Sequence, residues 1–129
     1  MNFYVCNANK YLEMNGVGGT LPFELRDLGD LRFLILERGT ISGTIPSEFG
    51  EIEDLLFLDL DFNNLSGTIP DSIYDLDQMF QLDLNNNRLT GTLSSLIGNL
   101  DQLTFFQTAA NQFSGTVPSE LGNLSNLRE

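Results

Sequence analysis

The chain has 129 residues, a formal net charge of −12 and 41% hydrophobic residues. This apolar content is typical of a folded domain rather than a disordered chain, and the length suits one domain. The acidic balance argues against nucleic acid and against an anionic membrane surface as partners, because both attract Lys and Arg. No stretch reaches the ~18 consecutive apolar residues of a membrane span, so we expect no span in this chain. The chain also lacks histidine, the commonest general base, which disfavours an enzyme.

Five Gly-Thr pairs mark an internal repeat. Each pair lies 24 residues after the one before it, at positions 19–20, 43–44, 67–68, 91–92 and 115–116. All four prolines keep the same register, at Pro22, Pro46, Pro70 and Pro118. A fixed period of this length indicates a solenoid in which each coil stacks on its neighbours. We therefore predict about five 24-residue repeats over residues 9–129, ending at the start of a sixth.

Each repeat contains the same elements in the same order. Alternation at Leu58 and Leu60 predicts a short strand with one buried face. An asparagine then turns the chain, since a buried amide can bond the backbone groups that a tight bend leaves unpaired. The period of 24 predicts this structural row of asparagines at Asn15, Asn63, Asn87 and Asn111, with Gly39 replacing it once. The segment after each proline, such as 46–49, is expected to return along the opposite side as a helical turn.

The segment from Leu58 to Pro70 resembles the plant-type leucine-rich repeat, with the pattern LxxLxLxxNxLxGxIPxxLGxLxx. Proteins of this family include the ectodomains of receptor-like kinases, receptor-like proteins and secreted polygalacturonase inhibitors. The resemblance implies an α/β fold: a right-handed solenoid with a parallel inner β-sheet and short helical or 3-10 turns on the convex side. It further implies a recognition scaffold that is extracellular or at the cell surface and binds a peptide, protein or glycan. No cofactor is expected.

The two ends differ from a complete family member. The segment Phe3-Tyr4-Val5-Cys6 is similar to the tail of the family's N-terminal cap, so residues 1–8 are interpreted as a cap remnant. The last residues begin a sixth repeat, and we interpret the chain as a fragment. A solenoid cut within a repeat exposes apolar surface where a polar cap would sit, which makes self-association through the uncapped ends possible.

Residues that flank the two strand leucines should point away from the core and form a ligand-binding strip on the concave face. The strip is predicted to contain Phe33, Ile35, Glu37, Phe57, Asp59, Asp61, Phe62, Gln81, Asp83 and Phe105. Adjacent strands lie ~4.8 Å apart, so aromatic rings would stack beside a row of carboxylates. Such a strip suits a cationic or amphipathic partner; the plainer interpretation is a solvated strand face. Calcium takes ~6–8 oxygen ligands, and carboxylates at this spacing do not need it, so no metal is predicted.

A second regular feature is a row of hydroxyls. One column consists of Thr20, Thr44, Thr68, Thr92 and Thr116. Regular rows of hydroxyls on a flat face resemble ice-binding surfaces, which gives an alternative function. The competing interpretation is that Thr suits a half-buried strand. Two Asn-x-Ser sequences, at Asn64 and Asn123, are possible N-glycosylation sites.

Overall fold

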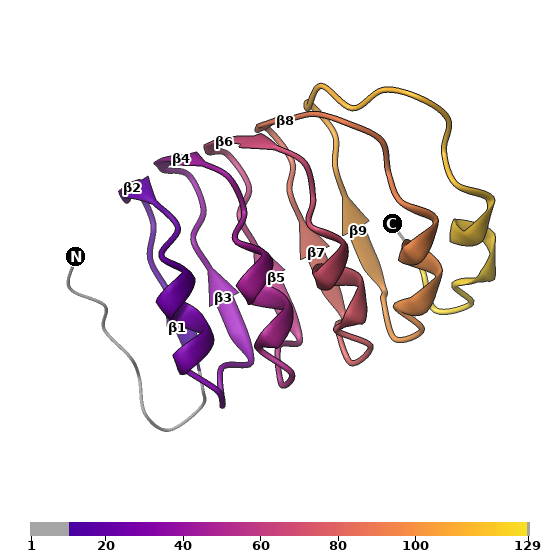
Figure 1. Cartoon of the computed structure of the whole chain (residues 1–129), viewed down its shortest axis with the longest axis horizontal. Helices are drawn as coiled ribbons and strands as arrows, with labels where there is room; N and C mark the ends of the chain where they lie inside the picture. Colours follow the sequence, from indigo (N-terminus) through magenta and orange to yellow (C-terminus); the bar gives the residue numbers. More distant parts are fainter. Residues whose placement is uncertain (1–10, 129) are drawn as a thin grey trace.

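The computed structural model describes residues 11–128 of the chain as a stack of coils with two parallel sheets. The cap remnant expected at residues 1–8 lies outside the described residues. The larger sheet, here called the inner sheet, has five strands in the order β1-β3-β5-β7-β9, one from each coil (Figure 1). These strands are β1 (Tyr11–Glu13), β3 (Phe33–Ile35), β5 (Phe57–Asp59), β7 (Gln81–Asp83) and β9 (Phe105–Gln107). The parallel inner sheet expected from the sequence is confirmed.

A smaller sheet and a row of 3-10 helices complete each coil. The smaller sheet has the order β2-β4-β6-β8 and is made of β2 (Gly18–Thr20), β4 (Thr40–Gly43), β6 (Asn64–Gly67) and β8 (Arg88–Leu89). The 3-10 helices are η1 (Phe23–Asp27), η2 (Ser47–Glu51), η3 (Asp71–Asp75), η4 (Ser95–Asn99) and η5 (Ser119–Asn123). Each helix starts after Pro22, Pro46, Pro70, Ser94 or Pro118, whose extended backbone ends the preceding segment. The helical return segments predicted after the prolines are therefore 3-10 turns.

The core lies between the inner sheet and the 3-10 helices. Leu34, Leu58 and Leu82 of the inner strands are fully buried, as are Phe49 and Ile73 of the 3-10 helices. Burying such a side chain stabilises the fold by ~1.5–3 kcal/mol. Each strand faces this core with one side only. Its other side points away from the core, and we call this side the outer surface of the inner sheet.

The Gly-Thr marker has a packing role between coils. Gly67 has a φ of 78°, in the left-handed region that glycine adopts without strain. A Cβ on Gly67 would lie 2.9 Å from the Thr44 methyl group of the preceding coil. The same arrangement joins Gly91 to Thr68, with a corresponding distance of 2.8 Å. Glycine is thus required for two reasons: the backbone conformation, and the methyl group that packs where a Cβ would lie.

The row of buried asparagines closes the turn after each inner strand. The amide nitrogen of Asn63 donates to the carbonyls of Leu36, Leu60 and Asp61, at 2.7, 3.2 and 3.0 Å. Its oxygen accepts from the backbone N–H of Ile41 at 3.0 Å. Asn87 and Asn111 make the same kinds of bonds in the next two coils. One amide side chain therefore joins two neighbouring coils.

The expectation for Asn15 is wrong, because the first coil departs from the period of 24. Tyr11 pairs with Phe33, 22 residues away, whereas Phe33 pairs with Phe57, 24 residues away. Gly16, with a φ of 71°, takes the turn position that Arg38 holds in the next coil. Asn15 precedes that position and is exposed, outside the row of buried asparagines. The first coil is two residues shorter between its inner strand and its Gly-Thr pair.

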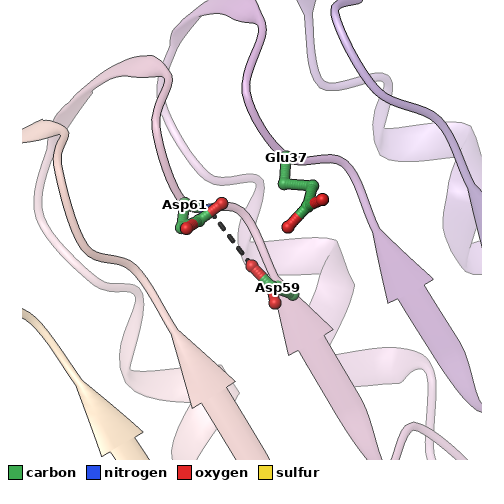
Figure 2. A group of neighbouring side chains, drawn as sticks. All are labelled: Glu37, Asp59 and Asp61. Carbon is green, nitrogen blue, oxygen red and sulfur yellow. Dashed lines mark hydrogen bonds between the residues drawn. The ribbon is translucent and has the colours of Figure 1, made fainter.

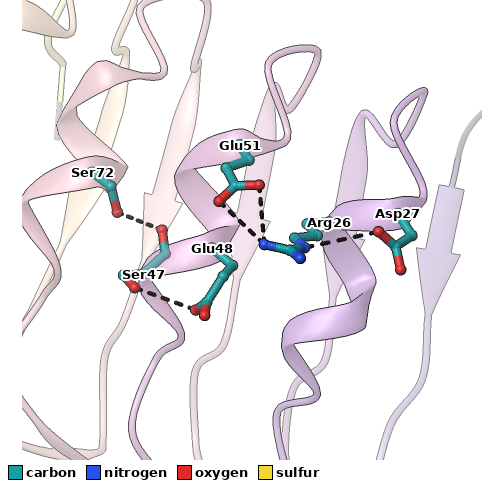
Figure 3. Close-up of polar contacts among 6 residues, drawn as sticks. All are labelled: Arg26, Asp27, Ser47, Glu48, Glu51 and Ser72. Atoms are coloured by element: carbon teal, nitrogen blue, oxygen red, sulfur yellow. Dashed lines mark hydrogen bonds and ion pairs between the residues drawn. The ribbon is translucent and has the colours of Figure 1, made fainter.

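The surface of the 3-10 helices carries ordinary polar contacts. Arg26 on η1 forms an ion pair with Glu51 on η2 at 3.3 Å, and both side chains are exposed (Figure 3). Ser72 donates its hydroxyl to the carbonyl of Ser47 at 2.6 Å in the same region. Exposed pairs of this kind contribute ~0–1 kcal/mol, so this side of the solenoid is solvated surface with little electrostatic stabilisation.

Candidate functional site

A row of aromatic rings crosses the outer surface of the inner sheet. We call it the aromatic row; it consists of Tyr11, Phe33, Phe57 and Phe80. Successive ring centroids are 5.2, 4.8 and 6.3 Å apart, within the range of favourable aromatic pairs. Parallel pairing places Tyr11, Phe33 and Phe57 at equivalent positions of neighbouring strands, which brings these three rings side by side. Part of the aromatic surface of the row is open to solvent; the side chain of Phe80, for example, is 38% exposed.

Phe80 was not predicted as part of this surface. The repeat places Gln81 beside Phe57, and the two residues do pair in the sheet. However, the Gln81 amide donates to Asp59 at 3.2 Å, and the ring of Phe80, one residue earlier, approaches Phe57. Phe80 precedes the strand, at a position that alternation within the strand does not describe. Phe105 also lies on the inner sheet and is 40% exposed, but it makes no ring contact with the row in residues 11–128.

Three carboxylates gather beside the aromatic row. Glu37, Asp59 and Asp61 place one oxygen each within 4.8 Å of one another (Figure 2). We call them the acidic triad. Asp59 accepts hydrogen bonds from the Asp61 backbone N–H and from Gln81, both at 3.2 Å. The Asp61 Oδ1 atom is buried and has no hydrogen-bond partner among the described residues. The triad thus contains a carboxylate oxygen that the fold itself leaves unsatisfied.

The electrostatics of the triad are unfavourable to ionisation. The pKa of Asp59 is raised to about 6, mainly by burial and also by the charges of Asp83, Asp61 and Glu37, while the hydrogen bond from the Asp61 backbone lowers it. Burial, Asp83 and Glu37 likewise raise the pKa of Asp61, against the opposing charge of Arg38. No arginine among residues 11–128 forms an ion pair with the triad. A cation placed there would relieve this repulsion.

Asp83 differs from the expectation that it faces a ligand. Its side chain is only 9% exposed and accepts a hydrogen bond from the Asn85 backbone N–H at 3.0 Å. It therefore acts on the triad through its charge and stabilises the turn after β7.

The rim of the surface is formed by the turn residues after the inner strands. Phe62 has a φ of 48° and Arg38 a φ of 53°, conformations that cost ~1–3 kcal/mol in residues other than glycine. Phe62 is 50% exposed, and the Arg38 guanidinium lies over its ring at 5.9 Å. Ile35 is half-buried at the end of β3. The left-handed turn therefore presents two large side chains beside the triad.

The hydroxyl row is explained by packing between coils. Thr20, Thr44, Thr68, Thr92 and Thr116 are exposed, as predicted. The methyl groups of Thr44, Thr68 and Thr92 nevertheless pack toward the glycine of the next coil. A second column of hydroxyls stands two residues before each of these threonines from Thr44 on. It donates to glycine carbonyls of the preceding coil, as Ser66 does to Gly43 at 3.3 Å. Nothing in this arrangement favours ice binding, and we do not propose it.

The two possible glycosylation sites differ in accessibility. Asn64 is half-buried on β6, and Asn123 is exposed at the end of η5. Both stay predictions, as does the absence of a metal at the triad.

Residues 54–76 and 79–100 match the family model described as Leucine Rich Repeat. Together with the parallel coils and their 3-10 turns, this match shows that the chain contains leucine-rich repeats. No helix among the described residues is long and apolar enough to cross a bilayer. No curated protein matches the chain.

Similar solved structures are ectodomains of plant receptor kinases and related receptors. The chain is 34% identical to the plant peptide hormone receptor RGFR1, solved with RGF2, with a TM-score of 0.87 over 89% of this chain and 18% of that one. It is 35% identical to a chain of the BIR3–SERK2 complex from Arabidopsis thaliana, with a TM-score of 0.82 over 85% of this chain and 60% of that one. The ectodomain of the Arabidopsis thaliana receptor kinase GASSHO1/SCHENGEN3, solved with CASPARIAN STRIP INTEGRITY FACTOR 2, shows 35% identity and a TM-score of 0.87 over 91% and 14%. The chain spans less than two thirds of each of these proteins.

Proposed function

We propose that the chain is a non-catalytic recognition module that binds a peptide or protein through the outer surface of its inner sheet. The observation that carries this proposal is the aromatic row lying beside the acidic triad. Neither feature is needed to fill the core, because the buried leucines of the inner strands point to the other side of the sheet. Exposed aromatic surface next to charged groups is typical of surfaces that recognise a partner.

Similar solenoids support this proposal. RGFR1 is in complex with RGF2, and the receptor kinase HAESA is in complex with the peptide hormone IDA and the co-receptor SERK1. HAESA is 31% identical to this chain, with a TM-score of 0.88. By analogy we propose that this chain belongs to a cell-surface receptor-like or secreted protein and is extracellular. Because the chain spans only part of these receptors, we do not transfer their ligands to it.

The test compares variants on the two sides of the solenoid. Phe57→Ala removes the centre of the aromatic row, and Phe23→Ala removes an exposed ring of similar size from η1. The purified chain and both variants are screened against displayed random 12-residue peptides and against an array of plant cell-wall glycans. Loss of binding in Phe57→Ala, with binding kept in Phe23→Ala, supports recognition through the inner sheet. If no probe binds, or if both variants bind as the parent does, the proposal is wrong.

The glycan array also distinguishes a peptide ligand from a glycan ligand. Binding to glycans alone would replace the peptide by a polysaccharide, since aromatic rings stack on sugar faces as well as on side chains. Self-association through the ends of the solenoid is a separate proposal. Sedimentation at two protein concentrations tests it, and a monomer at both would refute it.

A further inference from the structure

We infer that the ligand of the inner-sheet surface presents an arginine side chain to the acidic triad and an apolar side chain to the aromatic row. This inference rests on the proposed function and specifies the chemistry of the peptide. It commits to a peptide segment in extended conformation. The supporting observations are the spacing of the two features and the charge of the triad.

The spacing suits two side chains of one extended segment. Phe57, Asp59 and Asp61 alternate along one strand and its extension, so neighbouring members lie about 6.6–6.8 Å apart on the same face. The aromatic row and the triad are therefore separated by about one such step. In an extended peptide, side chains two residues apart point to the same side with the same separation. A ligand with an apolar residue two positions from an arginine matches both features together.

Charge complementarity favours a cationic side chain at the triad. Three carboxylates with oxygens within 4.8 Å of one another have no ion-pair partner among residues 11–128. A charged donor from a ligand would bond the oxygens of these half-buried carboxylates and offset the repulsion between them. The net charge of −12 attracts cationic ligands to the protein as a whole.

The arrangement favours arginine over lysine. A guanidinium has five N–H donors in a planar fork and can bond two or three carboxylates at once, whereas an ammonium is a compact point charge. A guanidinium also stacks on aromatic rings, so it tolerates the neighbouring row. The chain itself shows such a contact at the rim, where Arg38 lies over Phe62 at 5.9 Å. The ligand's arginine would occupy an equivalent environment closer to the carboxylates.

Protonation of the triad should weaken this binding. The pKa of Asp59 is about 6, so the carboxylate loses its charge as the pH falls through that value. The other charged groups facing it are Glu37, Asp61 and Asp83, with Arg38 opposing them beside Asp61. A bound guanidinium stabilises the ionised form, which links binding to proton release.

The experiment selects ligands and then changes one charge at a time. Displayed random 12-residue peptides are selected on the immobilised chain at pH 7.5, and the enriched peptides are resynthesised with arginine or with citrulline, its neutral isostere. We expect enrichment of arginine with an apolar residue two positions away. We expect citrulline to weaken binding at least about tenfold, as does loss of one charged hydrogen-bonding partner in general.

Protein variants test the same contact from the other side. Asp59→Asn and Glu37→Gln should each reduce the preference for arginine over citrulline, while Asp75→Asn on the exposed side of η3 should leave it unchanged. Far-ultraviolet circular dichroism confirms that each variant is folded. Enriched peptides that bind equally well with citrulline, or whose preference survives both triad variants, would overturn this inference and leave the proposed function standing. If no peptide is enriched, the proposed function itself fails.

Discussion

The clearest quantitative test of the triad is the stability of Asp59→Asn. The pKa of Asp59 is raised from 3.8 to about 6 in the folded protein. Because the folded pKa is above the unfolded one, the folded state binds more protons, and stability is lost as the pH rises from about 4 to about 6. A shift of about two units corresponds to an upper limit of ~3 kcal/mol, which solvent screening of a partly exposed group reduces to ~1–2 kcal/mol.

Asparagine removes this penalty without removing the local hydrogen bond. In the parent protein, the Asp59 carboxylate accepts a hydrogen bond from the Asp61 backbone N–H at 3.2 Å. The side-chain oxygen of asparagine can accept the same bond. We therefore expect Asp59→Asn to stabilise the protein by ~1–2 kcal/mol at pH 7.5 and by about half as much at pH 5.0. Urea unfolding at the two pH values measures the difference, with Asp75→Asn as an exposed control that should change stability by less than ~0.5 kcal/mol. A loss of stability in Asp59→Asn, or an equal gain at both pH values, would refute the electrostatic account of the triad.

Three further predictions concern the packing between coils, and urea unfolding measures each. Asn63→Ala should cost ~3 kcal/mol because it leaves buried backbone groups of two coils unpaired; Asn111→Ala, at a more exposed position, should cost less. Gly67→Ala should cost ~1–3 kcal/mol through its φ of 78° and its contact with Thr44. Thr44→Ser, which removes the opposing methyl group, should recover part of this loss in a double-mutant cycle, and additive effects would show that the contact does not matter. Arg26→Gln should cost less than ~0.5 kcal/mol, since its ion pair is exposed.

The fold could be predicted from the sequence because its main determinants repeat. Leucines and the Gly-Thr pairs recur at equivalent positions of successive coils, and proline precedes four of the five 3-10 helices, so the period alone indicates the stack of coils. The register of the first coil could not be obtained in this way. Its Gly19-Thr20 pair keeps the period, whereas the two missing residues lie before that pair, between Tyr11 and Gly19. The position of the Gly-Thr pair therefore does not predict the register of the strand that precedes the two missing residues.

The candidate site was predictable only in part. Alternation along β3 and β5 correctly indicates that Phe33, Phe57 and Asp59 face away from the core. It does not indicate that Phe80 replaces Gln81 in the aromatic row, because that outcome depends on a side-chain hydrogen bond between two coils. Nor does it reveal the burial of Asp83, which follows from a local bond to its own turn. Such details depend on side-chain conformations rather than on the period.

The shortened first coil has a consequence for the surface. Had the period of 24 extended to the first strand, Tyr11 would lie beside Ile35 rather than Phe33. Instead, the centroid of its ring lies 5.2 Å from that of Phe33, in a tilted arrangement, and the aromatic row is longer by one coil. Residues that pack between coils recur from one coil to the next in this chain, whereas the residue types on the outer surface of the inner sheet change. The surface also contains carboxylates whose burial and mutual repulsion destabilise the folded state. Folding does not require either feature, whereas the proposed binding of a complementary ligand would account for both.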